Sequence, residues 1–277
     1  MNAIKKTTLS LALVLVSCIV YSQEYKPSFK VSKGQEYNYL MDMTMDMTQS
    51  MGGQEMKYGM SSKATVKNTI SEVMPDGKIE IITSNWDASV TSKIMKDTTM
   101  TYKGKVGPST KFILDKFGNI LSRTKLEADS SENKIPGLDN MSNSTIFCEF
   151  PEKPISPGDK WIKEHTDSVP SPVGKLEFKI KSEYTLGSKE TIEGKSLYKL
   201  LCTSNIQISG KGNMQGMDIA MDGTGIKTDD IYFDPSTGTI FSDKANMELD
   251  INVAITGQQN MTIPMNQKVA INFKLIK

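Results

Sequence analysis

Methionines are concentrated in one short stretch of the chain, and their thioether sulfurs are its most distinctive chemical groups. Six of them recur at the spacing of one strand face or follow it across the Gly52-Gly53 pair: Met41, Met43, Met45, Met47, Met56 and Met60. A thioether is a soft ligand that suits Cu(I), so a methionine-rich segment can bind copper. The same side chain is flexible and polarizable, and can therefore line a surface that adapts to different apolar ligands.

The spacing along a strand weighs against a metal site built from one strand alone. Side chains at i and i+2 of a strand are about 6.6–6.8 Å apart, so three thioethers of one strand cannot easily reach the same ion. A Cu(I) site would need sulfur atoms from at least two strands within roughly 4 Å of each other. We expect these methionines to pack in the core, with ligand binding and Cu(I) coordination as the two functional alternatives.

Signatures of catalysis are missing from the sequence. It has no Gly-x-Ser-x-Gly elbow, P-loop, His-Glu-x-x-His or Cys-x-x-Cys motif. The single histidine, His165, excludes a multi-histidine metal site and is expected in a solvated loop before Pro170. Aspartates such as Asp115 and Asp234 are expected at turns or on polar strand faces. We therefore predict a protein without enzymatic activity and without a cofactor.

The first 22 residues have the layout of a secretory signal peptide. A short basic start precedes an apolar run over residues 9–20, and Ser22 supplies a small residue before the expected cut. The run is too short to span a bilayer, which needs about 20 residues, so no transmembrane span is expected. Cleavage after Ser22 would give a secreted or periplasmic protein. Alternatively, Leu15-Val16-Ser17-Cys18 resembles a lipobox, which would anchor the chain through a lipid on Cys18.

The composition excludes some partners. The chain has 33 Lys and Arg against 32 Asp and Glu, and loss of residues 1–22 with their two lysines moves the formal charge from +1 to −1. A nearly neutral surface gives no electrostatic basis for binding nucleic acid or an anionic membrane. Two cysteines remain, Cys148 and Cys202. Export permits a disulfide between them, whereas the apolar setting of Cys202 favours a buried free thiol.

Apolar and polar residues alternate with period two over nearly the whole mature chain, which predicts β-strands. We expect a long C-terminal hairpin around residues 257–260 and hairpin turns at Asp76-Gly77 and Glu193-Gly194. The best helix candidate is short and lies within residues 130–144. Long strands that are apolar on one face predict an all-β fold. They would form a large antiparallel sheet, either curved into a half-barrel or packed as a sandwich.

Three pairs of landmarks indicate that the chain contains two similar halves of about 120 residues. They recur in the same order at nearly one spacing: residues 31–37 with 155–161, residues 83–85 with 203–205, and residues 112–120 with 232–240. The seam lies at Phe150-Pro151-Glu152-Lys153-Pro154. We therefore divide the chain into a signal peptide at 1–22, a first β pseudo-repeat at 23–150 and a second at 151–277.

Several of these segments resemble an uncharacterised family of secreted, β-rich Bacteroidetes proteins that is described only as a domain of unknown function. The similarity rests on Lys33–Tyr39, the methionine run to Met47, Met51–Gln54, Phe150–Pro154 and Pro157–Trp161. It implies export and a β-rich fold, but no activity and no site residues. The architecture looks similar to the curved half-barrels of lipoprotein carriers such as LolA, a likeness of fold that implies no function by itself.

The sequence thus predicts an exported, non-catalytic protein whose apolar concave face holds a lipid or another hydrophobic small molecule. The motivation is the number of long strands with one apolar face, together with flexible methionines on the first of them. One alternative is a structural or interaction module of the cell envelope, in which the apolar faces serve only as core. The other is Cu(I) binding by the methionine-rich first hairpin.

Overall fold

The computed structural model describes most of the mature chain, in seven segments. These are residues 24–94, 98–104, 109–126, 146–171, 174–214, 216–257 and 260–276. The predicted signal peptide at 1–22, with Cys18, and the predicted helix within 130–144 lie outside the described residues. The described residues contain no helix, and hence none that is long and apolar enough to cross a membrane.

Twelve strands form the described part of the chain. They are β1 (Glu36–Met51), β2 (Gln54–Val73), β3 (Ile79–Ile94), β4 (Thr98–Gly104), β5 (Thr110–Leu114), β6 (Ile120–Lys125), β7 (Lys160–Ser171), β8 (Gly174–Ile192), β9 (Lys195–Met214), β10 (Met217–Phe233), β11 (Ile240–Thr256) and β12 (Met261–Leu275). The all-β prediction is confirmed. The strands are long because their alternation of apolar and polar residues continues without a break.

All twelve strands belong to one antiparallel sheet rather than to a sandwich. Its order is β6-β5-β3-β2-β1-β12-β11-β10-β9-β8-β7, and β4 pairs with β3 beside this path. Strands that follow one another in sequence are mostly neighbours in space. Apart from β5, which lies against β3, the exception is the central pair, in which β1 lies against β12 with Tyr39 opposite Leu275 and Gln49 opposite Met265. This long-range pair joins the two halves of the chain.

Tight turns join the long strands, as expected. Glu193 and Gly194 connect β8 to β9 with φ values of 50° and 78°, and two successive positive φ values define the type I′ hairpin turn. The Asp76-Gly77 turn between β2 and β3 has Gly77 at φ 85°. The predicted C-terminal hairpin is β11–β12, paired from Ser242–Lys274 to Ile255–Met261.

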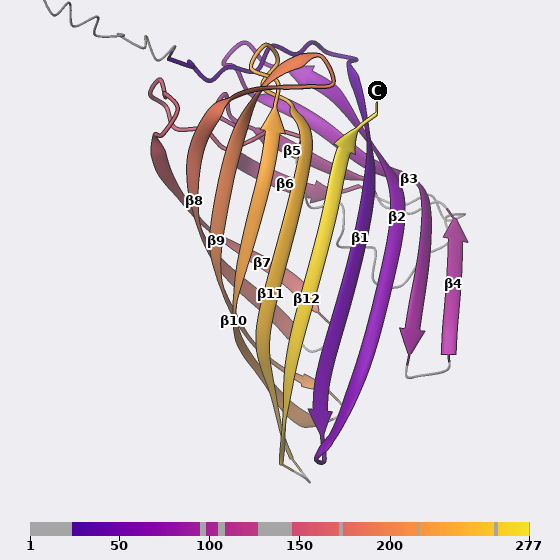
Figure 1. Cartoon of the computed structure of the whole chain (residues 1–277). Helices are drawn as coiled ribbons and strands as arrows, with labels where there is room; N and C mark the ends of the chain where they lie inside the picture. The colour runs from indigo at the N-terminus through magenta and orange to yellow at the C-terminus, as the bar shows by residue number, and fades with distance from the viewer. Residues whose placement is uncertain are drawn as a thin grey trace, which may run out of the picture.

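The sheet curls strongly about its long axis. In Figure 1, β7 lies behind the wall formed by β8 to β12, β1 and β2. Side chains join the two ends of the sheet: Arg123 of β6 and Asp167 of β7 form an ion pair at 3.8 Å. Lys163 Nζ also donates to Asn119 Oδ1 at 2.7 Å. No hydrogen-bonded pairing joins β6 to β7 in the described residues, so the sheet is curved but not closed into a barrel.

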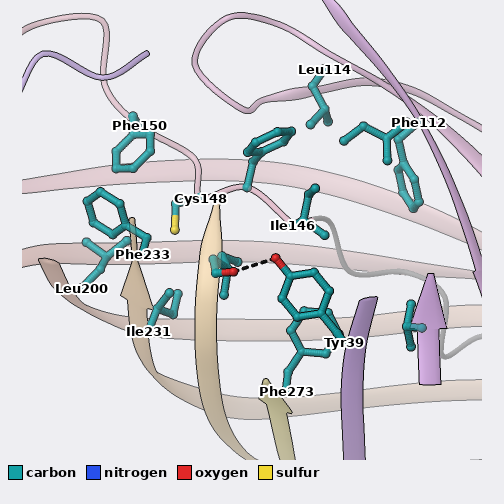
Figure 2. Close-up of a cluster of buried hydrophobic side chains, with 14 of the residues drawn as sticks. Tyr39, Phe112, Leu114, Ile146, Cys148, Phe150, Leu200, Ile231, Phe233 and Phe273 are labelled. Carbon is teal, nitrogen blue, oxygen red and sulfur yellow. Dashed lines mark hydrogen bonds between the residues drawn. The ribbon is translucent and has the colours of Figure 1, made fainter. Parts of the chain in front are cut away.

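A large core fills one end of this curved sheet. Residues 146–155 run through it, and Phe150 and Phe233 are fully buried with ring centroids 5.1 Å apart. Figure 2 shows the Tyr39 hydroxyl, which donates to the backbone oxygen of Ile240 at 2.6 Å. This bond links β1 to β11 inside the core. Because the side chains here are in close contact and excluded from water, this end offers no room for a ligand.

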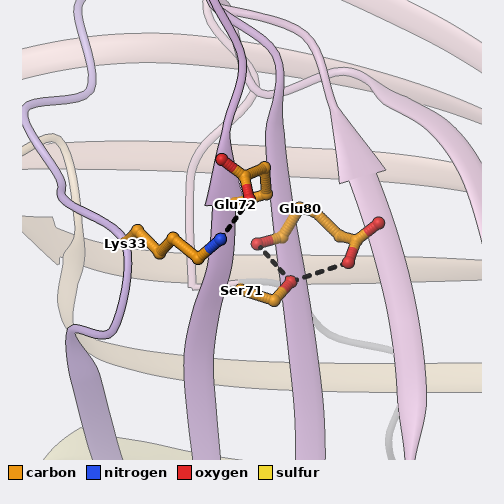
Figure 3. A network of polar contacts seen from close by, with 4 residues as sticks. All are labelled: Lys33, Ser71, Glu72 and Glu80. Carbon is orange, nitrogen blue, oxygen red and sulfur yellow. Dashed lines mark hydrogen bonds and ion pairs between the residues drawn. The ribbon is translucent and has the colours of Figure 1, made fainter.

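The segment before β1 is fixed to the same end of the sheet. Tyr25 pairs with Ile155 through two backbone hydrogen bonds and is 7% exposed. On the surface, Lys33 pairs with Glu72 of β2, beside the Ser71 hydroxyl that donates to Glu80 of β3 (Figure 3). Solvent screens this exposed ion pair, so the burial of Tyr25 contributes more to fixing this segment.

Three further expectations can be compared with this fold. Cys148 and Cys202 are buried free thiols and do not form a disulfide. The prediction that His165 lies in a loop was wrong, because it is an exposed residue within β7. The two pseudo-repeats are not confirmed. A meander of consecutive strands gives the same neighbour relations in both halves with or without a duplication, so the division at residue 150 stays a prediction.

Candidate functional site

The register of the strands places the inward side chains in rows that cross the sheet. One of these, which we call the central row, crosses seven strands from β2 to β8 through directly opposed residues. It consists of Met60, Met45, Val269, Met247, Lys227, Ser204 and Ser182. It begins with methionine, passes through apolar residues and ends in polar ones. The concave face is therefore chemically divided along this row.

The methionine half of the concave face continues from the packed core, which Met60 contacts. We define the methionine face as the half-buried residues Met45, Met47, Met56, Met60 and Met265, which belong to β1, β2 and β12. Their partial exposure shows that the apolar face is not sealed at this end of the sheet. A molecule that covered them would remove further apolar surface from water.

The six methionines singled out from the sequence divide into two groups. Met41 and Met43 are buried, with 6% and 8% of their surface exposed, and Met41 belongs to the aromatic core. These two are packing residues, as expected for the simplest interpretation. The other four are half-buried and lie on the methionine face: Met45, Met47, Met56 and Met60. The structure thus separates residues that the sequence pattern treats alike.

Polar groups contact two of these sulfur atoms, one from a neighbouring strand and one from the same strand. Gln267 Nε2 of β12 donates to the sulfur of Met45 at 2.7 Å, and the Tyr58 hydroxyl lies 3.7 Å from the sulfur of Met56. Met45 also lies directly opposite Met60 in the β1–β2 pair. Directly opposed side chains are about 4.5–5.5 Å apart at Cβ, so the side chains of Met45 and Met60 start from adjacent positions on two strands.

The other half of the concave face carries a group of buried and half-buried polar side chains. We call it the polar belt, and it consists of Ser182, Tyr184, Cys202, Ser204, Lys227, Asp229 and Asp243, from β8, β9, β10 and β11. It lies between the aromatic core and a second apolar cluster built around Ile206, Ile208 and Leu249. A polar layer between two apolar clusters is costly unless its members are paired.

One ion pair accounts for part of the belt. Lys227 Nζ lies 2.6 Å from Asp229 Oδ1, and the Asp229 side chain is only 4% exposed. Burial alone would lower the pKa of Lys227, but attraction to Asp229 and Asp243 outweighs it, so the pKa is raised and the ammonium form is favoured. About a third of the Lys227 side chain, 35%, is exposed, so the pair can be reached from outside the core.

Asp243 is the least satisfied member of the belt. Its Oδ1 atom is buried and has no hydrogen-bond partner among the described residues. Burial, with repulsion from Asp229, raises its pKa from 3.8 to about 7, although Lys227 acts in the opposite direction. A carboxyl group that titrates near neutral pH inside a protein is a common mark of a functional position.

The remaining members of the belt are neutral and hydrogen-bonded. The hydroxyls of Ser182 and Ser204 are 2.8 Å apart, and Cys202 Sγ lies 3.5 Å from the Ser204 hydroxyl. The Tyr184 hydroxyl donates to Glu149 Oε2 at 3.3 Å. Burial raises the pKa of the Cys202 thiol and of Tyr184, so neither is activated as a nucleophile or base. The arrangement suits binding of a hydrogen-bonding group better than covalent chemistry.

Metal binding by the belt has no support in its geometry. Within the segments that the structure describes, no group of three or more His, Cys, Asp or Glu is placed to hold a metal ion. A soft-metal site in the described residues would have to rest on the thioethers of the methionine face. For that, Met45 and Met60 are the candidate pair, because they are directly opposed on β1 and β2.

Two glycines of β10 lie on the concave face next to the polar belt. Gly223 and Gly225 take inward positions of β10, where the side chains of Ile251 and Leu249 lie over them. A Cβ added at Gly225 would collide with Leu249 and lie 2.6 Å from the backbone oxygen of Glu248. The absence of side chains at these positions lets the side chains of Leu249 and Ile251 lie across β10 in the second apolar cluster.

The sequence interpretation missed the polar belt, although a signal for it exists. Along β10, Lys227 and Asp229 occupy the same phase of the period-two pattern as Ile231 and Phe233, which are buried. The belt residues of β8 and β9 likewise interrupt an inward apolar series. A polar residue on the apolar phase in neighbouring strands therefore marks an interior site, whereas we expected the aspartates to lie on solvated faces.

Comparison with known proteins gives a partial family match. The family described as "Family of unknown function (DUF6263)" matches residues 123–240, which include the belt residues of β8, β9 and β10 but end before Asp243. No curated protein matches the chain. The likeness to Bacteroidetes proteins and to LolA finds no support in these comparisons.

Two solved structures resemble the fold only distantly. The crystal structure of Pseudomonas aeruginosa OccK2 (OpdF) is 6% identical, with a TM-score of 0.27 over 88% of this chain and 98% of that one. The structure of OccK5 (OpdH) from the same organism is 7% identical, with a TM-score of 0.23 over 88% and 99%. Likenesses at such scores carry no argument about this protein.

Proposed function

We propose that this protein is an exported, non-catalytic binding protein that holds an apolar molecule, such as a lipid or acyl chain, on its methionine face. The observation that carries the proposal is the partial exposure of that face at the end of the sheet away from the aromatic core. Burying an apolar side chain fully contributes about 1.5–3 kcal/mol, and half-buried methionines have gained only part of this. A bound apolar tail would cover the exposed part of these methionines and so add the remaining stabilisation from burial.

Flexibility at the site fits an apolar ligand of variable shape. Methionine has three rotatable bonds and a polarizable sulfur, so a group of methionines can adapt its shape to different alkyl chains. The face is also bounded by polar residues on the convex side of the same strands, such as Asp42 and Asp46. A bound molecule would thus be directed to the concave side.

Native mass spectrometry of the protein purified from its own host, followed by lipid extraction, tests the proposal directly. We expect an additional mass that is released into organic solvent and that is lost in a double variant with Met45→Gln and Met60→Gln. Glutamine keeps the length of methionine but is polar. The matched control is Met261→Gln at the exposed start of β12, which should retain the ligand. A ligand-free native protein that also fails to take up lipid would overturn the proposal.

Cu(I) binding is the second candidate, because Met45 and Met60 are directly opposed across two strands. Competition for Cu(I) against bicinchoninate would give the affinity, and the same double variant should abolish it if these thioethers are the ligands. Absence of competition by the unaltered protein would leave the methionines as packing or lipid-contacting residues.

A structural or interaction module of the cell envelope is the remaining alternative. The sealed aromatic core supports it, because that end of the molecule has the density of an ordinary protein interior. Export itself also belongs to the proposal. N-terminal analysis of the mature protein is expected to find Gln23, whereas a lipid-modified Cys18 would indicate the anchored form.

A further inference from the structure

We propose that the polar belt binds the polar end of an amphiphile whose tail lies on the methionine face, and that this polar end is a primary amine. This inference rests on the proposed function and adds the chemical class of the ligand. Its basis is the arrangement of one unpartnered carboxylate, one internal ion pair and an adjoining open apolar face on the same concave surface.

The central row makes the two parts of such a site continuous. Met45 and Lys227 lie in this row on β1 and β10, and only Val269 and Met247 stand between them. Three strand spacings of about 4.8 Å separate them by roughly 14 Å along the concave face. An alkyl chain laid along the row would therefore contact only apolar side chains until it reached the belt.

Among the described residues, the belt is more exposed towards the methionine face than towards the aromatic core. Towards the aromatic core, Leu186, Leu200 and Phe233 are fully buried and leave no approach. Towards the methionine face, the Lys227 side chain is 35% exposed, and its neighbour Met247 is half-buried. Asp243 lies opposite Ile231 and Phe273, four residues along β11 from Met247 towards the core. A ligand that enters from the methionine face would therefore pass Lys227 before its polar end reaches Asp243, and its tail would lie on the methionines.

The charges of the belt select the kind of polar group. Lys227 and Asp229 neutralise each other at 2.6 Å, so an ionised Asp243 leaves a net charge of −1 in a poorly hydrated place. Its buried Oδ1 is an acceptor that lacks a donor. A primary ammonium group would supply both the donor and the missing positive charge, as in other charge-assisted hydrogen bonds. A carboxylate or phosphate would be repelled by two aspartates.

The surroundings of Asp243 decide how binding depends on pH. The charged or titratable groups that influence it are Asp229 and Lys227 on the adjacent strand, with Asp230 beyond them. Cys148 also couples electrostatically to Asp243, but burial raises the pKa of that thiol well above its usual value, so it stays neutral. Because the ionised form of Asp243 is the binding form, affinity for an amine should rise between pH 6 and pH 8.

Calorimetric titration with three probes of equal chain length tests the inference on the unaltered protein. The probes are dodecylamine, dodecanol and dodecanoate, each below its micelle concentration. We expect dodecylamine to bind at least tenfold more tightly than the other two at pH 8, and to lose this advantage at pH 6. Equal affinities for the three probes, or a preference for dodecanoate, would overturn the inference while leaving the proposed function intact.

Variants separate the two parts of the site. Asp243→Asn should weaken dodecylamine binding at pH 8 about tenfold and leave dodecanol unchanged, whereas the Met45→Gln, Met60→Gln double variant should weaken all three probes. Asp222→Asn on the convex face is the matched control and should change nothing. If no probe binds the unaltered protein, the proposed function fails and this inference fails with it. Urea denaturation of each variant confirms that it is folded.

Discussion

Replacing Asp243 by asparagine should stabilise the protein above neutral pH and remove much of its pH dependence. The pKa of Asp243 is raised from 3.8 to about 7 in the folded state, mainly because the side chain is buried and lies near Asp229. The folded state therefore binds a proton more tightly than the unfolded state. Ionisation of this group opposes folding, and asparagine cannot ionise.

The size and sign of the effect follow from linkage between protonation and folding. A shift of about three pKa units corresponds to about 4 kcal/mol, at about 1.36 kcal/mol per unit. Because the folded pKa is the higher one, the protonated form of Asp243 stabilises the folded state. This stabilisation is fully present below about pH 4, is lost as the pH rises through 7, and is absent above it. In the asparagine variant, the side chain at position 243 does not titrate, so it should not lower the free energy of unfolding as the pH rises.

Urea denaturation at pH 5, 6, 7 and 8 measures the difference. Relative to the unaltered protein, Asp243→Asn should gain about 2–4 kcal/mol at pH 8 and progressively less towards pH 5. Asp222→Asn on the exposed convex face is the control and should follow the unaltered protein at each pH. The reasoning is refuted if the gain is the same at pH 5 and pH 8, or if the variant is less stable at pH 8.

Other consequences of the structure can be tested by the same methods. Gly225→Ala should lower the free energy of unfolding, measured in urea, by about 1–3 kcal/mol, because its Cβ would lie 2.6 Å from the backbone oxygen of Glu248. The control Gly59→Ala makes only ordinary contacts and should not have this effect. Equal effects of the two variants would contradict the packing of β10. Tyr39→Phe should lower the free energy of unfolding by about 1–3 kcal/mol, because it removes the hydroxyl that donates to the backbone oxygen of Ile240 in β11. Unchanged stability would argue against that hydrogen bond. Burial raises the pKa of Cys148, so its thiol should react with Ellman's reagent only in denaturant; rapid reaction of the native protein would show an open core.

The alternation of residue types was sufficient to predict the strands and several turns. Period two is a local property, since successive side chains of a strand point to opposite faces, so it can be read without knowing any partner strand. The β11–β12 hairpin and the turn at Glu193-Gly194 follow from it, because both connect neighbours in sequence. The inward position of Cys202 could be predicted for the same reason.

The same pattern could not separate residues that share one strand face. Met41 and Met45 have the same phase on β1, yet one is in the aromatic core and the other on the half-exposed methionine face. The difference arises because residues 146–155 fill only one end of the curved sheet. Which end is filled depends on a segment about a hundred residues away in sequence, which no local pattern of β1 contains.

The sequence by itself determined that this is an all-β chain of long strands, each with an apolar face, because that information is carried by nearest neighbours along the chain. Only the tertiary structure decided that β1 pairs with β12, and that pairing sets the methionine face and the polar belt in one continuous row. The belt itself has members on four strands. The pairing of β10 with β11 brings Lys227 within electrostatic range of Asp243, which lies opposite Ile231, and their burial comes from the curvature of the whole sheet.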